Sequence, residues 1–161
     1  MRTGIGYDSH RLAPGRRLII GGVEIPFDGK GLVGHSDADV LLHSIIDAVL
    51  GAAGLGDIGT MFPDTDDKWK DADSIGLLEI VMRQLKGSGL EVTWVDCVVI
   101  AERPRLRPYI DAMKIAISAS GIGAELINIK AKTNESMGFI GRAEGIAAIA
   151  TCVLEKRQAE P

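Results

Sequence analysis

Hydrophobic and polar positions alternate in some segments of the chain and recur every three or four residues in others, and these two periods predict its strands and helices. Runs typical of strands occupy residues 2–9, RRLIIGGVEIPF (16–27), LEVTWVDCVVIA (90–101) and LINIKAK (126–132). In the second run Gly21 and Gly22 can adopt the positive φ of a tight turn, so two short strands should pair there as a β-hairpin. The third run becomes wholly apolar, as expected of a central strand.

Apolar residues three and four positions apart predict a first helix from about residue 37 to 52. Ser36 or Asp37 can serve as its N-cap, because a short polar side chain accepts hydrogen bonds from the free N–H groups of the first turn. Gly51 or Gly54 marks its end, since glycine favours the left-handed conformation of a helix cap.

Two further helices and one ambiguous segment complete the pattern. The second helix spans about 73–87 and ends in KGSG, and the third begins at Pro108 and runs to about 119. The final segment, GIAAIATCVLEK (145–156), suits a helix by its alanines and a strand by its β-branched residues. Residues 60–72 form a long polar loop of the kind that often carries function. Neither a repeat nor a linker appears, so we predict a single domain over residues 1–161 with a mixed α/β layer architecture.

Composition and charge narrow the classes of function. The net charge is -4 at pH 7 and aromatic residues make up 4% of the chain, which argues against a nucleic-acid polymer as partner, because such proteins need a basic surface and usually stacking rings. Cys97 and Cys152 lie inside apolar runs and are interpreted as buried thiols, which suits a reducing cytoplasm. The sequence has neither the apolar core of a signal peptide nor an apolar run of about 18 residues. We therefore expect a soluble cytoplasmic protein without a membrane partner.

The segment IGYDSHR places a carboxylate and an imidazole two positions apart near the end of a predicted strand. Side chains at i and i+2 of a strand share one face, so Asp8 and His10 can converge on one object. His43 lies at the edge of the apolar face of the first helix and completes an Asp/His/His set, which has the ligand number of a catalytic zinc site. The alternatives are an Asp-Ser-His turn that caps the strand and a hydrogen-bonded core histidine.

Other polar residues gather where a phosphate or a sugar can bind. His35 and Ser36 begin the first helix, whose free N–H groups attract anions, although Ser36 can also be a simple cap. The segment GLGDIG matches the pattern GxGxxG but follows a helix, so it does not predict a dinucleotide site. Asp57 within it can hold a diol or stabilise a turn.

Two loops that follow strands carry charges suited to a phosphorylated substrate. In KTNESMGFIGR, Thr133, Glu135 and Arg142 offer a hydroxyl, a carboxylate and a guanidinium for phosphate binding, magnesium ligation and charge neutralisation. In AERPRLR (101–107) three arginines follow a strand, and the alternative is an ordinary charged surface loop.

Taken together, GYDSHR, GHSDADVLLHSIIDAVLGAAGLGDIGTMFPDTD and NIKAKTNESMGFIGRAEGIA closely resemble the 2-C-methyl-D-erythritol 2,4-cyclodiphosphate synthases of the non-mevalonate isoprenoid pathway. The resemblance runs nearly end to end. It implies an α/β (α+β) fold with helices packed on one face of a mixed sheet, and it makes the ambiguous final segment a strand. It further implies a homotrimer with active sites between subunits, and an apolar cavity on the threefold axis where Phe139 and Arg142 hold an isoprenoid diphosphate.

The same resemblance implies roles for individual residues. Asp8, His10 and His43 would hold Zn²⁺, and Glu135 would help to hold Mg²⁺ or Mn²⁺ between the substrate phosphates. His35 and Thr133 would be the catalytic residues that orient or stabilise the phosphates. The other substrate contacts would be Ser9 and Ser36 near the metal; Asp57, Ile58 and Gly59 at the methylerythritol; Phe62, Pro63, Asp64, Thr65 and Asp66 in a closing loop; Ala101, Glu102, Arg103, Pro104, Arg105, Leu106 and Arg107 at the cytidine diphosphate; and Lys132 and Asn134 on an adjoining subunit.

The implied reaction converts 4-diphosphocytidyl-2-C-methyl-D-erythritol 2-phosphate into 2-C-methyl-D-erythritol 2,4-cyclodiphosphate and CMP. Because the 2-phosphate of the substrate attacks its own β-phosphate, this phosphorus–oxygen lyase needs no protein nucleophile. Two other classes of function share parts of the pattern. One is a phosphohydrolase that uses zinc-activated water, and the other is a non-catalytic trimer that binds isoprenoid diphosphates.

Overall fold

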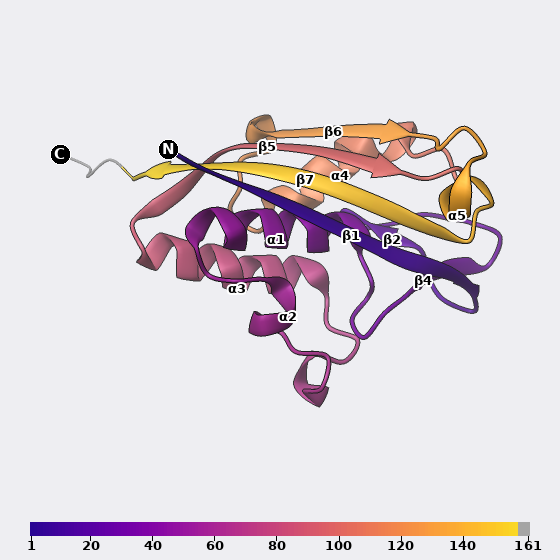
Figure 1. Cartoon of the computed structure of the whole chain (residues 1–161), viewed down its shortest axis with the longest axis horizontal. Helices are drawn as coiled ribbons and strands as arrows, with labels where there is room; N and C mark the ends of the chain where they lie inside the picture. The colour runs from indigo at the N-terminus through magenta and orange to yellow at the C-terminus, as the bar shows by residue number, and fades with distance from the viewer. Residues whose placement is uncertain (158–161) are drawn as a thin grey trace.

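Five strands form the main sheet of the computed structural model, which describes residues 1–157 (Figure 1). Their order across the sheet is β4 (Lys30–Val33), β1 (Arg2–Pro14), β7 (Gly145–Lys156), β5 (Leu90–Ile100) and β6 (Ile127–Lys132). Strand β7 is antiparallel to both β1 and β5, whereas β5 and β6 are parallel. The sheet is therefore mixed, as expected, and the segment that composition left ambiguous is its central strand.

Two long helices cover one face of this sheet (Figure 1). Helix α1 (Val40–Ala53) packs on β1 and β7, and α3 (Ser74–Gly87) packs on α1 and β5. Helix α1 approaches β1 closely because β1 has glycine at the contact: a Cβ on Gly6 would lie 2.0 Å from the carbonyl oxygen of Ser44. Helix α4 (Ile110–Ser118) packs on β6. The expected one-sided helical layer is confirmed.

Helix α1 begins two to three residues later than predicted. Its N-cap is Asp39, whose carboxylate accepts hydrogen bonds from the N–H groups of Leu41 and Leu42. Ser36 and Asp37, the predicted caps, have their side chains turned toward other partners. The helix ends at a left-handed Gly54, one of the two predicted stops.

The fully buried Asp39 also holds the predicted hairpin against the helix. Strands β2 (Ile19–Ile20) and β3 (Val23–Glu24) pair around Gly21 and Gly22, and the N–H groups of these glycines donate to the Asp39 carboxylate at 2.9 and 2.7 Å. Burial raises the pKa of Asp39 to about 6, although its backbone hydrogen bonds oppose the shift.

Several short elements were not predicted. Besides β4, they are α2 (Ile58–Met61), α5 (Gly138–Gly141) and three 3-10 turns, η1 (Asp67–Trp69), η2 (Arg107–Tyr109) and η3 (Ala124–Leu126). Pro108 begins the third helical segment as a 3-10 turn, from which α4 continues. The predicted loop 60–72 thus contains two short helical turns.

Both cysteines agree with the prediction from sequence. Cys97 and Cys152 are free and buried, and burial raises the pKa of each thiol to about 12. Among the helices of residues 1–157, none has the length and apolar character needed to cross a membrane.

The other face of the sheet bears exposed apolar side chains. Ile5 is 70% exposed and Trp94 43% exposed, and Tyr7 is exposed as well. The strand register aligns Tyr7 of β1, Ile149 of β7 and Val98 of β5 in one row across this face. We call the surface formed by Ile5, Tyr7, Trp94, Val98 and Ile149 the open sheet face.

Candidate metal centre and substrate site

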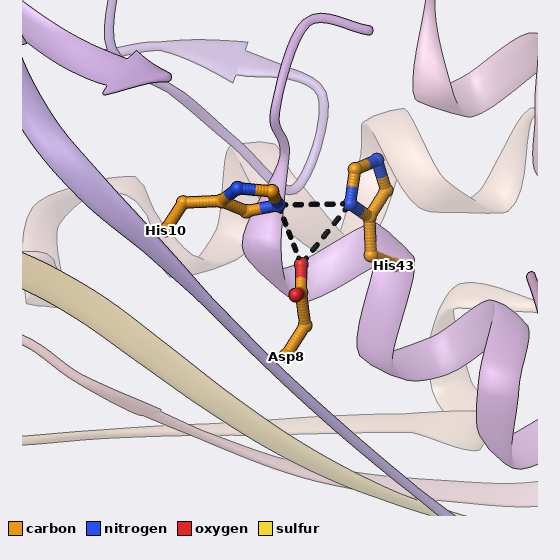
Figure 2. A group of neighbouring side chains, drawn as sticks. All are labelled: Asp8, His10 and His43. Atoms are coloured by element: carbon orange, nitrogen blue, oxygen red, sulfur yellow. Dashed lines mark hydrogen bonds and ion pairs between the residues drawn. The ribbon is translucent and has the colours of Figure 1, made fainter. Parts of the chain in front are cut away.

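Three potential metal ligands from β1 and α1 converge at one point (Figure 2). Asp8 and His10 leave β1 on the face that α1 covers, and His43 reaches them from α1. Asp8 Oδ2 lies 2.8 Å from His10 Nε2 and 3.0 Å from His43 Nδ1, and the two ring nitrogens are 3.1 Å apart. The strand alternation and the close packing of α1 on Gly6 together produce this triangle.

Hydrogen bonds outside the triangle orient two of its members. His10 Nδ1 lies 3.0 Å from the carbonyl oxygen of Val33. Because a carbonyl can only accept, Nδ1 carries a proton, and Nε2 is the nitrogen that faces Asp8. The N–H of Ser9 donates to the second oxygen of Asp8 at 2.8 Å. The Asp8 carboxylate and His10 Nε2 thus face each other, an arrangement that a shared cation in place of a proton stabilises.

The charges within the triangle reinforce one another. Burial tends to raise the pKa of Asp8, but its bonds to His10 and His43 outweigh this effect and hold the pKa well below its ordinary value. Burial tends to lower the pKa of His10, but the Asp8 carboxylate outweighs it and leaves the pKa raised. Asp8 therefore remains ionised at neutral pH, and a metal ion competes with a proton for His10.

The triangle opens into a hollow of about 460 Å³. Its lining includes these predicted site residues: Asp8, His10, His35, Ser36, His43, Ile58, Gly59, Phe62 and Asp64. Gly34, Trp69 and Leu77 also line it and were not predicted. Trp69 could have been predicted, because it is an aromatic residue inside a polar loop. Its ring packs edge-on against that of Phe62, with the ring centroids 4.8 Å apart.

Other predicted residues of the sugar region lie beside this lining. Asp57 is the N-cap of α2 and accepts a hydrogen bond from the N–H of Thr60 at 2.7 Å. Asp47 of α1 accepts from the N–H of Ile58 at 2.8 Å and so fixes α2 to the helix that carries His43. The side chain of Ser9 belongs to the opposite face of β1. Pro63, Thr65 and Asp66 are outside the lining, although the Asp66 carbonyl lies 3.3 Å from His35 Nε2.

The predicted cytidine and phosphate residues form a second group where β5 and β6 end. The N–H of Ala101 donates to the carbonyl of Lys132, and the carboxylate of Glu102 accepts from the N–H of Asn134 at 3.2 Å. Thr133 donates its hydroxyl proton to Glu135 at 2.7 Å. The remaining members are Arg103, Pro104, Arg105, Leu106 and Arg107, of which the three arginines are exposed. None of this group lines the hollow at the metal triangle.

The residues predicted to face a central cavity lie next to this second group. Phe139 belongs to α5 and is exposed. Arg142 follows α5 and pairs with Glu144, with its Nε 2.8 Å from a carboxylate oxygen. This pairing raises the pKa of Arg142 and lowers that of Glu144.

Comparison with known proteins identifies the family that shares this sequence and fold. A family model described as the YgbB family matches residues 1–155. The 2-C-methyl-D-erythritol 2,4-cyclodiphosphate synthase of Salinibacter ruber is 53% identical over 156 residues, which cover 96% of this chain and 99% of that protein. Among solved structures, the bifunctional IspDF of Campylobacter jejuni matches with a TM-score of 0.91 and 43% identity over 96% of this chain, which spans 42% of that longer protein. IspF of Plasmodium falciparum, solved as a CDP complex, matches with a TM-score of 0.84 and 32% identity over 98% of this chain and 97% of that one. The chain therefore belongs to the YgbB family, among the 2-C-methyl-D-erythritol 2,4-cyclodiphosphate synthases.

Proposed function

We propose that this protein converts 4-diphosphocytidyl-2-C-methyl-D-erythritol 2-phosphate into 2-C-methyl-D-erythritol 2,4-cyclodiphosphate and CMP. The observation that carries the proposal is the Asp8, His10 and His43 triangle in the lining of a hollow, in a chain with 53% identity to a synthase of this name over 96% of its length. The whole chain acts as one synthase domain in this proposal.

The two groups of residues would bind different ends of the substrate. Asp57, Ile58 and Gly59 would hold the methylerythritol at the hollow, with residues 62–66 closing beside it. Residues 101–107 and 132–135 would hold the cytidine diphosphate, supported by the exposed arginines and by the CDP complex of the Plasmodium relative. His35 and Ser36 would orient the phosphates from the hollow, and Thr133 would do so from the second group.

The donor atoms suggest which metal ions take part. Two imidazoles and a carboxylate suit Zn²⁺, whereas the oxygen donors of Glu135 and the substrate phosphates suit Mg²⁺ or Mn²⁺. When bound, these ions would supply Lewis acidity and neutralise phosphate charge. The protein itself would align two mutually repelling phosphates for in-line attack, so no side chain has to act as nucleophile.

Replacement of His43 by alanine tests the metal assignment. Because the neighbouring side chains Ile46, Val49 and Leu50 still fill the core, the variant should fold while zinc content and turnover fall together. Metal analysis of the purified wild type and variant measures this. A full zinc equivalent with near-normal turnover in the variant would make His43 a core histidine instead.

We further propose that the protein is a homotrimer with shared active sites. Within one subunit the second group does not line the metal hollow, and the open sheet face offers an apolar surface for other copies. Phe139 and Arg142 would then lie near a central cavity able to hold an isoprenoid diphosphate. The free thiols of Cys97 and Cys152 support a cytoplasmic location.

Isotopically labelled water tests the reaction against hydrolysis. If the 2-phosphate is the nucleophile, its oxygen becomes the bridge of the cyclic diphosphate, and solvent contributes no atom to either product. The masses of CMP and of the sugar product should therefore be those of unlabelled compounds. A linear product that carries one solvent oxygen would establish a phosphohydrolase and overturn the proposal.

A further inference from the structure

The nitrogen of His43 that faces away from the metal triangle has two serine partners. Its Nε2 lies 3.0 Å from Ser74 Oγ and 3.1 Å from Ser36 Oγ. Ser74 is the first residue of α3 and is fully buried. The packing of α3 against α1 therefore places one buried hydroxyl directly behind a predicted metal ligand.

Asp37 determines whether the Ser74 hydroxyl donates a hydrogen bond to His43 or accepts one from it. One oxygen of the Asp37 carboxylate lies 2.5 Å from Ser74 Oγ, and the other accepts from the Ser74 N–H at 2.9 Å. An ionised carboxylate only accepts hydrogen bonds, so the Ser74 hydroxyl donates to Asp37. Its oxygen is then left to accept, and His43 Nε2 must donate to it.

Ser36 does not determine which nitrogen of His43 carries the proton. Its hydroxyl oxygen accepts from the N–H of Ala38 at 3.2 Å, and its own proton remains free to turn toward His43 Nε2. Ser36 can therefore serve either tautomer of His43, whereas Ser74 serves only the one with the proton on Nε2.

We infer that Asp37 and Ser74 form a positioning relay that keeps a proton on His43 Nε2, so that Nδ1, which faces Asp8 Oδ2 at 3.0 Å, is the nitrogen left to bind a metal ion. Neither residue belongs to the metal triangle. The relay acts through His43 alone, in the way that carboxylate and hydroxyl partners orient metal-bound imidazoles elsewhere. It requires that α1 and α3 be packed together, because Asp37 precedes one helix and Ser74 begins the other.

The substitution Asp37→Asn reverses the relay with almost no change in shape. The amide NH₂ can donate to Ser74 Oγ while the amide oxygen accepts from the Ser74 N–H, so both bonds to Ser74 survive, and only the 3.2 Å bond from the Asp39 N–H to the same side-chain atom is lost. The Ser74 hydroxyl then donates to His43 Nε2, and the ring proton moves to Nδ1. In metal-free protein, ¹⁵N NMR of the histidine rings should show a proton on His43 Nε2 in the wild type and a proton on Nδ1 alone in the variant. Affinity for Zn²⁺, measured by competition with a chromogenic chelator, should fall by roughly 10- to 100-fold.

Ser44→Ala is the matched control. Ser44 is a fully buried serine on α1, and its hydroxyl donates only to the Leu41 carbonyl at 2.8 Å. Its removal costs a buried hydrogen bond without touching the relay, so zinc affinity and the His43 tautomer should match the wild type.

Two results would overturn the relay: unchanged zinc affinity in Asp37→Asn, or a metal-free wild type whose His43 carries no proton on Nε2. The second result needs no variant, so a folding failure of Asp37→Asn leaves the inference testable. The inference rests on the metal site of the proposed function, but neither readout is turnover. A linear product from the wild type would refute the synthase reaction and leave the tautomer result standing, and a failed relay would leave the synthase reaction standing.

Discussion

At the scale of single residues, Asp39 is a fully buried carboxylate that joins two elements. It accepts from the N–H groups of Leu41 and Leu42 at the start of α1, and from those of Gly21 and Gly22 in the hairpin turn. Such bonds satisfy its lone pairs, yet burial still disfavours the charge and raises its pKa from 3.8 to about 6. The folded protein therefore binds a proton at Asp39 more tightly than the unfolded chain does.

This shift predicts a pH-dependent term in stability. A raised folded pKa contributes stability that is fully present below the unfolded pKa and is lost as pH rises through the folded one. Between pH 4 and 6 the free energy of unfolding of the wild type should fall relative to that of Asp39→Asn, by at most about 1.4 kcal/mol per pH unit. Urea unfolding of both proteins in a metal chelator measures the difference and cancels the groups they share. A difference that stays constant over this range would contradict the assignment.

The spacing of residues along the chain predicted some contacts at the metal site and not others. Asp8 and His10 were expected on one side of a strand because alternation is a local property of the backbone. The same rule places the Ser9 side chain on the other face of β1, although the family resemblance implied that Ser9 contacts the substrate. The contact between Asp37 and Ser74 joins residues 37 positions apart and exists only after two helices pack, so no local pattern predicts it.

At the scale of elements, the contact between α1 and β1 depends on glycine. A Cβ at Gly6 would lie 2.0 Å from the Ser44 carbonyl oxygen and 2.8 Å from the Ala48 nitrogen, both backbone atoms. Since the backbone of α1 cannot yield locally, a side chain there has to push the whole helix outward. His43 is adjacent to Ser44, so the metal triangle moves with the helix.

Gly6→Ala should therefore lower the free energy of unfolding by about 1–3 kcal/mol and weaken zinc binding as well. Gly51→Ala is the control within the same contact: it lies inside α1, and its nearest atom to a new Cβ would be the Ile5 carbonyl oxygen at 4.0 Å. That change should stabilise the protein by about 1 kcal/mol, because alanine is the better helix former. Urea unfolding and zinc competition measure both. Equal effects of the two substitutions would show that the close approach does not constrain α1.

Elements were predictable where the pattern was long enough. The longer strands and helices have clear periods, although β1 extends to Pro14 beyond its predicted end at residue 9, and the alanines of β7 hid a strand until family resemblance decided it. The two-residue strands β2 and β3 were predictable from the glycine pair between them. β4, α2 and α5 have only four residues each, too few for a period to register. The start of α1 was misplaced because three of the four residues 36–39 have side chains that can cap a helix. The choice among Ser36, Asp37 and Asp39 depends on what the rest of the fold places beside them.

At the scale of the whole molecule, two features support the proposed trimer. The open sheet face is exposed, and the second group of residues does not line the metal hollow of the same subunit. Sedimentation should report a trimer for the wild type. Ile5→Glu places a charge on the open sheet face and should give monomers that bind zinc, because Asp8 and His10 lie on the other side of β1, but turn over little substrate. Ile115→Glu is the control, since Ile115 is 68% exposed on α4 while Ile5 is 70% exposed, and it should remain a trimer. A monomer with full turnover would refute the shared site.

The central position of β7 also determines when the Asp8, His10 and His43 triangle can form during biosynthesis. Only the last four residues of β1 pair with the nearby β4. The earlier residues of β1 pair with β7, where Asp8 lies opposite Ala148 and His10 opposite Ile146. The ribosome adds roughly 130 residues between the end of β1 at Pro14 and the start of β7 at Gly145, which takes on the order of ten seconds. Throughout that interval most of β1 lacks its strand partner, so the Asp8, His10 and His43 triangle should assemble only after β7 has left the exit tunnel.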